Sequence, residues 1–186
     1  MARKKEITLD RILDAAEAII SETGGWHFTL DAVAERARVS KGGLVYSFAT
    51  KDDLIAAALT REIKRFRGAV ARPTEQQGTS GQEKLISYVD EVLEEDEALS
   101  RKASFLMTAL VHAPEAIEPA RGLYQWIFEL FDDATPEGRD VRQAVLAVEG
   151  LFFLRGLGLV DVTSEQWVSV LTHARETLVR LLLRRV

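Results

Sequence analysis

The chain offers few residue combinations that could perform catalysis. It has no cysteine, and its three histidines, His27, His112 and His173, are far apart and lack the spacing of metal ligands. Residues 40–43 (SKGG) lack the glycine spacing and the Lys-Ser/Thr pair of a phosphate-binding loop, and no Gly-x-Ser-x-Gly motif is present. The acidic run 94–97 fits the solvated end of a helix better than a pair of catalytic carboxylates. We therefore predict a protein that is not an enzyme and that uses no metal and no cofactor.

A segment near the start of the chain indicates a different chemistry, the recognition of nucleic acid. Residues 29–54 read TLDAVAERARVSKGGLVYSFATKDDL and predict two short helices separated by a tight turn at 38–39, with a further helix beginning at 51. Hydroxyl side chains that can cap these helices stand directly before them: Thr29, Ser40 and Thr50, the last with Asp53 in a capping box. Two helices joined by such a turn form a helix-turn-helix unit, whose second helix can enter a DNA major groove.

The same segment, with residues 11–20 (RILDAAEAII) upstream, resembles the tetracycline-repressor (TetR) family of transcription regulators. The resemblance covers roughly the first third of the chain. Its matching residues are Ile12, Ala15, Ala16, Thr29, Val33, Ala34, Val39, Ser40, Lys41, Gly42, Leu44, Tyr46, Phe48, Lys51 and Leu54. Arg38 departs from the usual turn glycine, Ser47 from a common histidine and Ala49 from a common proline. Because a positive φ is strained for a residue other than glycine, a local difference in the turn is expected at Arg38.

The resemblance implies which residues contact DNA, namely Thr29, Ser40, Lys41, Gly42, Gly43, Tyr46 and Lys51. Lys41 can bind a phosphate or a guanine edge, Tyr46 can donate its hydroxyl to a phosphate, and Lys51 has the family's phosphate-binding place at a helix N-terminus. Leu44 and Phe48 are expected to anchor the second helix in the core. Each of the two glycines lowers helix stability by about 1 kcal/mol. The resemblance favours close approach to DNA as their purpose, and tight packing against the preceding helix is the alternative.

Charge is distributed unevenly along a chain whose net charge is −5. Residues 1–67 carry 12 Lys and Arg against 10 Asp and Glu, whereas the remainder carries 12 against 19. DNA binding requires a local basic face rather than a basic protein, so the net charge does not exclude it. Arg3, Lys4 and Lys5 are expected to precede the first helix, either as an arm that lies along DNA or as a solvated terminus.

Apolar periodicity of 3.6 residues and only four prolines predict an all-α fold. About nine helices are expected, at 8–22, 30–37, 41–48, 51–70, 82–94, 98–112, 114–133, 139–159 and 164–184, with Pro136 marking the start of the eighth. We divide the chain into a DNA-binding domain (1–50), a connecting helix (51–71) and an effector-binding and dimerisation domain (72–186), which begins with a loop at 72–81. Trp26 and Phe28 are expected to fill the first core. No segment predicts a membrane span or a secretory signal, so the expected location is the cytoplasm.

The second part of the chain predicts a ligand site, because helical bundles bind small molecules in apolar cavities that hold a few polar groups. The candidate effector-binding residues are Phe105, Met107, His112, Trp126, Glu149, Phe152 and Phe153. Glu149 lies in an apolar segment (VLAVEGLFFLRGLG), where an unpaired charge is expensive to bury. It could neutralise a cationic effector, pair with an arginine across a dimer, or accept a hydrogen bond from a buried amide.

The last two helices carry more apolar surface than one core-facing side requires, which indicates a partner. The resemblance implies a homodimer through 139–159 and 164–184, with Leu171, Leu178, Val179 and Leu182 either at the interface or packed inward. Two reading helices would match a palindromic double-stranded DNA operator. We thus expect a dimeric transcription regulator, a repressor that a small-molecule effector releases from DNA. The alternative is a small-molecule-binding helical protein that does not bind DNA.

Overall fold

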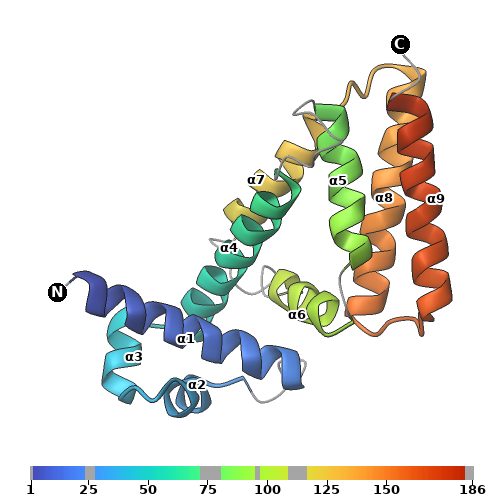
Figure 1. The fold of residues 1–186 in the computed structure, drawn as a ribbon. Helices are drawn as coiled ribbons and strands as arrows, with labels where there is room; N and C mark the ends of the chain where they lie inside the picture. Colours follow the sequence, from blue (N-terminus) through green and yellow to red (C-terminus); the bar gives the residue numbers. More distant parts are fainter. Residues whose placement is uncertain (1, 24–27, 72–80, 95–96, 109–116, 183–186) are drawn as a thin grey trace.

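The computed structural model describes residues 2–23, 28–71, 81–94, 97–108 and 117–182, and these ranges contain nine helices and no strand (Figure 1). The predicted all-α class is confirmed. In chain order the helices are α1 (Ala2–Thr23), α2 (Leu30–Ala37), α3 (Lys41–Ser47), α4 (Lys51–Val70), α5 (Gly81–Glu94), α6 (Glu97–Thr108), α7 (Ile117–Phe128), α8 (Pro136–Gly156) and α9 (Ser164–Leu182). A search of the described helices finds none with the length and apolar character of a membrane span.

Side-chain caps fix where the first helices begin. The Thr29 hydroxyl accepts a hydrogen bond from the Ala32 amide at 3.1 Å, and the Ser40 hydroxyl accepts one from the Gly43 amide at 3.1 Å. At α4, Thr50 accepts from the Asp53 amide at 3.0 Å while the Asp53 carboxylate accepts from the Thr50 amide at 2.9 Å. These bonds satisfy amides that have no partner inside the helix. All three predicted caps are confirmed.

The turn between α2 and α3 keeps the left-handed geometry although arginine occupies it. Arg38 has φ 52° and ψ 47°, and its amide donates to the Glu35 carbonyl at 3.0 Å. The next amide donates to the Ala34 carbonyl at 3.0 Å, which completes a Schellman ending of α2. From α1, Arg11 Nη2 donates to the Ala37 carbonyl at 2.5 Å. The expected local difference is therefore absent, because hydrogen bonds on both sides hold the strained residue in place.

Most helix limits follow the sequence pattern, and the differences concern helix ends. α2 and α4 have the predicted limits, and α8 begins at Pro136 after its Thr135 cap. α1 begins at Ala2 rather than residue 8, so the three basic residues expected before it belong to the helix instead. α7 is shorter than predicted, spanning Ile117–Phe128. Trp26 and His112 lie outside the described residues.

Two hydrophobic cores hold the molecule together. The first joins α1–α3, which we call the head, to α4, and it also includes Leu106 of α6 and Ala120 of α7. It contains Phe28 and Leu44 as predicted. The second joins α5, α7, α8 and α9, which with α6 we call the body. Helix α4 contributes to both, with Ile63 in the first core and Val70 in the second. In Figure 1 it runs from the head, at lower left, towards α5 and α7, and α6 is the part of the body that lies nearest the head.

The strained turn generates a stability prediction. A left-handed conformation costs a residue with a Cβ about 1–2 kcal/mol. Glycine avoids this strain, but part of the gain is lost because glycine gives up more conformational entropy when the chain folds. Arg38→Gly should therefore raise the free energy of unfolding by about 0.5–1 kcal/mol, measured by urea denaturation. Arg38→Ala is the control, because it removes the same side chain and keeps the Cβ. An alanine variant as stable as the glycine variant would contradict the strain.

Candidate functional site

Helix α3 presents nearly all of its surface to solvent. Among its residues Leu44 alone is buried, while Tyr46 is 84% exposed. Phe48, directly after the helix, packs against the first hydrophobic core. The seven predicted DNA contacts are all exposed: Thr29, Ser40, Lys41, Gly42, Gly43, Tyr46 and Lys51. A short helix anchored by one leucine and otherwise open to solvent suits insertion into a groove.

The two glycines of α3 are not required by packing within the head. A Cβ added at Gly42 would meet no heavy atom within 4 Å. At Gly43 the nearest atom is Ser40 Oγ, 3.1 Å away, which belongs to the cap of the same helix and not to α2. Tight packing against the preceding helix therefore explains neither glycine. The α3 backbone is bare on a side that is open to a large partner.

Two lysines flank this bare backbone. Lys41 Nζ lies 2.8 Å from Asp31 Oδ1, and both side chains are exposed. Exposed ion pairs contribute little to stability, so a phosphate could replace Asp31 at low cost. Lys51 begins α4 and holds its Nζ 5.4 Å from the centre of the Phe28 ring. A lysine at a helix N-terminus is a favourable arrangement for an anion.

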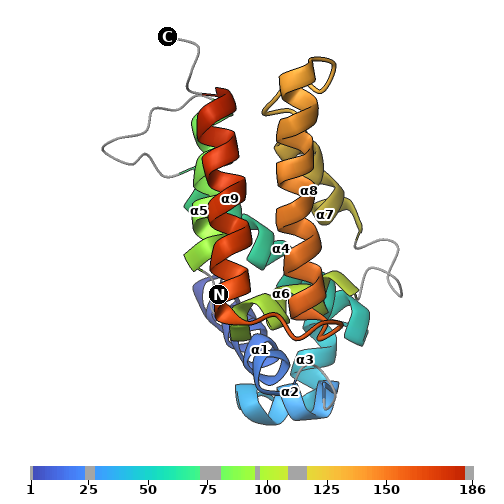
Figure 2. The same ribbon diagram turned by 90° about the vertical axis from the view of Figure 1, so that its right-hand side faces the viewer.

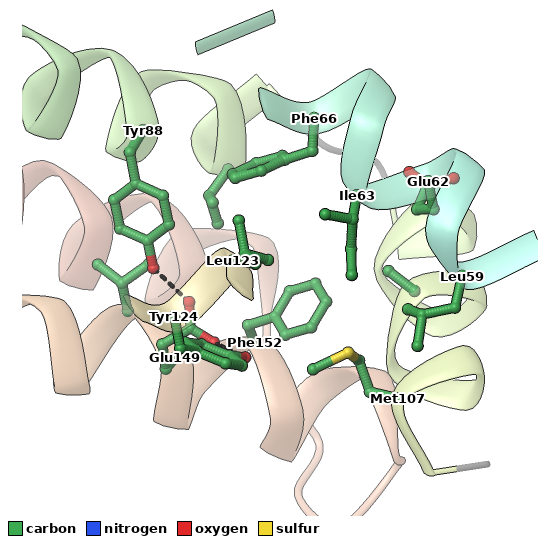
Figure 3. Close-up of a pocket in the computed structure, with 13 residues that line it drawn as sticks. Leu59, Glu62, Ile63, Phe66, Tyr88, Met107, Leu123, Tyr124, Glu149 and Phe152 are labelled. Atoms are coloured by element: carbon green, nitrogen blue, oxygen red, sulfur yellow. Dashed lines mark hydrogen bonds between the residues drawn. The ribbon is translucent and has the colours of Figure 1, made fainter. Parts of the chain in front are cut away.

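A cavity of about 60 Å³ lies in the body, where α4, α5, α6, α7 and α8 meet (Figure 3). Its lining consists of Leu59, Glu62, Ile63, Phe66, Tyr88, Val92, Ala103, Met107, Leu123, Tyr124, Val148, Glu149 and Phe152. Ligand pockets typically measure about 300–1,000 Å³, whereas this cavity has room for a few water molecules at most. A drug-sized ligand would have to push its walls apart.

Glu149 is held between two tyrosines on one side of this cavity. Tyr88 Oη donates to Glu149 Oε1 at 2.5 Å (Figure 3), and Tyr124 Oη donates to Glu149 Oε2 at 2.8 Å. Burial raises the pKa of Glu149 above its ordinary value, and the two tyrosine hydrogen bonds oppose that rise. Burial and the charge of Glu149 also raise the pKa of Tyr124. Within the described residues no salt bridge reaches Glu149, so its charge lacks a cationic partner.

The predicted effector residues separate into two groups. Met107, Glu149 and Phe152 line the cavity together. Phe105 instead packs against the head core, with its ring 6.5 Å from Phe28. Trp126 lies under the Arg67 guanidinium at 4.9 Å, and Phe153 contacts Phe152 from outside the lining. His112 lies outside the described residues.

Sequence reasoning missed the polar partners Tyr88, Tyr124 and Glu62. Each stands on the apolar stripe of its helix: Glu62 follows Leu59 by three residues, and Tyr88 follows Leu85 by three. A polar group at such a position points to a buried partner, and this periodicity could have identified them. In the part of the chain that the structure describes, no group of three or more His, Asp or Glu is placed to hold a metal ion.

The outward side of α8 and α9 carries exposed apolar side chains. The two helices run side by side in opposite directions (Figure 2). The exposed apolar residues are Leu146 and Leu154 on α8 and Val168 and Val170 on α9, and the connection between the two helices adds Leu157, Leu159 and Val160. Leu171 and Leu178 are fully buried within the chain, which agrees with the inward-packing alternative. Val179 is half-buried and packs partly against the second core. Leu182 is the last residue of α9, and its side chain lies outside the part of the chain that the structure describes.

Comparison with known proteins identifies two matching domain families. Residues 12–58 match the family described as bacterial regulatory proteins, tetR family, and residues 83–179 match the tetracyclin repressor-like C-terminal domain. The HTH-type transcriptional repressor KstR of Rhodococcus jostii (strain RHA1) is 32% identical over 99 residues, which cover 51% of this chain and 47% of the relative. The chain thus spans about half the length of that curated relative.

Solved structures resemble the chain over nearly its whole length. The multidrug binding protein EbrR complexed with ethidium has 27% sequence identity and a TM-score of 0.65, and the match covers 94% of this chain and 98% of that one. A transcriptional regulator from Rhodococcus sp. Rha1 has 21% identity and a TM-score of 0.72, with 92% and 96% covered. The second likeness concerns the fold alone.

The environment of Glu149 predicts a pH dependence of stability. Because the pKa of this buried carboxyl is raised in the folded protein, its neutral form favours folding at low pH. That contribution is complete below the ordinary glutamate pKa and is lost as the pH rises through the raised value. Glu149→Gln stays neutral, so its unfolding free energy should increase relative to the unsubstituted protein between pH 5 and pH 8. Urea denaturation at several pH values measures this difference. A difference that is constant with pH would contradict the raised pKa.

Proposed function

The chain belongs to the tetracycline-repressor (TetR) family of bacterial regulatory proteins, and we propose that it is a dimeric repressor that a small organic cation releases from a palindromic operator. The family assignment agrees with the prediction that the protein is not an enzyme, because its relatives are transcriptional regulators. The proposal keeps the division into a DNA-binding domain (1–50), a connecting helix (51–71) and an effector-binding and dimerisation domain (72–186).

The bare backbone of α3 is the observation that carries the DNA-binding part of the proposal. Gly42 has open space around it, Tyr46 projects into solvent, and Lys41 has only an exposed partner. These properties suit a helix that lies against base edges and phosphates. A helical protein that only bound small molecules would have no use for two exposed glycines, each of which lowers helix stability.

Dimerisation is supported by the exposed apolar residues of α8 and α9. Leu146 and Leu154 on α8, with Val168 and Val170 on α9, are exposed apolar side chains on adjacent antiparallel helices. A two-fold axis through this face would pair four helices and orient two heads towards successive half-sites. We take this face, rather than the buried Leu171 and Leu178, as the interface.

The charge and shape of the cavity support this class of effector. Its wall is mostly apolar and aromatic, and Glu149 supplies a carboxylate with no cationic partner among the described residues. An organic cation with an aromatic body would satisfy both features, since it could lie against the aromatic wall and compensate Glu149. The likeness to a multidrug binding protein complexed with ethidium supports the same class.

DNA binding can be tested through the exposed glycine. Selection from a random DNA pool should recover a palindrome, and fluorescence anisotropy then gives the operator Kd. Gly42→Ala should raise the Kd at least tenfold, because its methyl group occupies the space that DNA backbone or base edges need. The same change should leave the free energy of unfolding equal or raise it by up to about 1 kcal/mol.

Gly68→Ala is the matched control for this experiment. Gly68 also lies in a helix, and a Cβ added there would meet no heavy atom within 4 Å, but it belongs to α4 and not to the proposed DNA-reading helix α3. Its variant should gain similar stability and keep the operator Kd. Equal DNA affinity for the Gly42 variant and the control, or recovery of no enriched sequence at low salt, would contradict the proposed reading surface.

Effector binding can be tested with ethidium, whose positive charge is permanent. Without DNA, ethidium fluorescence should report binding that strengthens between pH 5 and pH 8, because the cation favours ionised Glu149. Glu149→Gln should weaken binding about tenfold near pH 8, equivalent to about 1.4 kcal/mol, and should flatten the pH profile. Asp90→Asn is the control, since Asp90 pairs with Arg175 outside the cavity lining. Equal affinities for both variants would exclude Glu149 as the cation site.

A further inference from the structure

A buried lysine joins three helices at the boundary between head and body. Lys102 of α6 is 5% exposed, and its Nζ lies 2.7 Å from Glu62 Oε2 of α4 and 3.2 Å from Glu17 Oε2 of α1. A buried ammonium is costly unless it is paired, and here two carboxylates from different helices pair with it. We call Lys102, Glu62 and Glu17 the ion node.

The head end of the ion node is also tied to α4. Arg61 Nη2 lies 2.8 Å from Glu17 Oε1, and Arg61 Nη1 lies 2.8 Å from Asp14 Oδ1. Glu17 therefore receives one cation from α6 and another from α4, whereas Asp14 has Arg61 alone among the described residues. These ion pairs link α1 to both α4 and α6, beside the apolar contacts of the first core.

The body end of the ion node is part of the cavity wall. Glu62 lines the cavity beside Leu59 and Ile63, on the same two turns of α4 (Figure 3). The cavity of about 60 Å³ is too small for an aromatic cation, so such a ligand must displace its walls. Displacement of this part of α4 necessarily affects the pairing of Glu62 with Lys102, and a ligand cation near Glu62 competes with the ammonium directly.

We propose that Lys102 couples ligand binding in the cavity to the orientation of the head. With the cavity closed, Lys102 pairs with Glu62 and Glu17 together and holds α1, α4 and α6 in one arrangement. A bound cation separates Glu62 from Lys102, which leaves the lysine paired with Glu17 of α1 alone and frees α4 to carry the heads to a different spacing. The inference rests on the proposed function and names its coupling residue. Lys102 acts as a positioning residue, since it is absent from both the cavity lining and the DNA-facing surface.

The measurable quantity is the coupling factor, the ratio of operator Kd values with and without saturating ligand. Tetraphenylphosphonium is the probe, because ethidium intercalates into the operator itself, and neutral triphenylphosphine oxide is the ligand control. The unsubstituted protein should give a factor of at least ten with the cation and about one with the neutral compound. By thermodynamic reciprocity, saturating operator should weaken cation binding by the same factor.

Two variants break the ion node from different ends. Glu17→Gln removes the head partner and leaves the Lys102–Glu62 pair intact, so it keeps a compensated buried lysine and should fold. Lys102→Met removes the central charge. Each should reduce the coupling factor at least fivefold. Asp14→Asn is the matched control, because it makes the same acid-to-amide change on α1 and removes the other partner of Arg61 without touching Lys102. It should keep the factor within twofold.

The outcomes separate this inference from the proposed function. If the unsubstituted protein binds the operator but the cation does not release it, both the effector proposal and the inference are wrong. If the cation releases the unsubstituted protein and Glu17→Gln to the same extent, the inference alone is wrong. An equal loss of coupling in Asp14→Asn would also overturn it, since the contact between α1 and α4 would then be responsible. If Lys102→Met does not fold, Glu17→Gln decides the question.

Discussion

The membership of helix α4 in both hydrophobic cores constrains the rest of the structure. Its first turn carries Lys51 beside the reading helix, Ile63 packs in the first core and Val70 in the second. Protein interiors are close-packed and move between discrete arrangements rather than deforming continuously. A change at the cavity side of α4 is therefore transmitted along a rigid helix, and it must be accommodated where that helix meets α1.

In the function that we propose, buried polar groups give the body its chemical selectivity. The apolar wall alone would accept many hydrophobic molecules, because apolar contact is not directional. Glu149 accepts hydrogen bonds from two tyrosines, and Glu62 pairs with a lysine. Both stand at positions where an apolar side chain could have been part of the core. Such groups stabilise a fold weakly at best, since desolvation offsets the attraction. We propose that these groups serve instead to recognise charge, at Glu149, and to link helices in a defined way, at Glu62.

Local features of the sequence predicted the structure of the head well. Contacts between helices that are distant in the sequence could not be predicted from it. Thr29, Ser40 and the Thr50–Asp53 capping box mark helix starts because a cap acts within one turn, and the limits of α2 and α4 follow from such signals. The pairing of Tyr88, Tyr124 and Glu149 joins three helices and left no local signature beyond polar residues on apolar stripes. Leu171 and Leu178 show the same limit, since periodicity identifies an apolar face but not whether the chain or a partner covers it. Arg38 was misjudged because the bonds that hold it come partly from α1.

In the function that we propose, the small volume of the cavity influences how effector and operator compete. A ligand that must open the cavity binds only the open arrangement of the protein. When this arrangement is a small fraction of the empty protein, the apparent affinity of the ligand is reduced in proportion to that fraction. If the operator binds the closed arrangement preferentially, it lowers the open population further, and a ligand that binds both arrangements equally would release nothing. Release then depends on how strongly the closed arrangement is held. Among the described residues, the contacts that hold the closed arrangement include a buried lysine shared by carboxylates from α1 and α4. In our proposal, cation recognition and head orientation compete for these ion pairs.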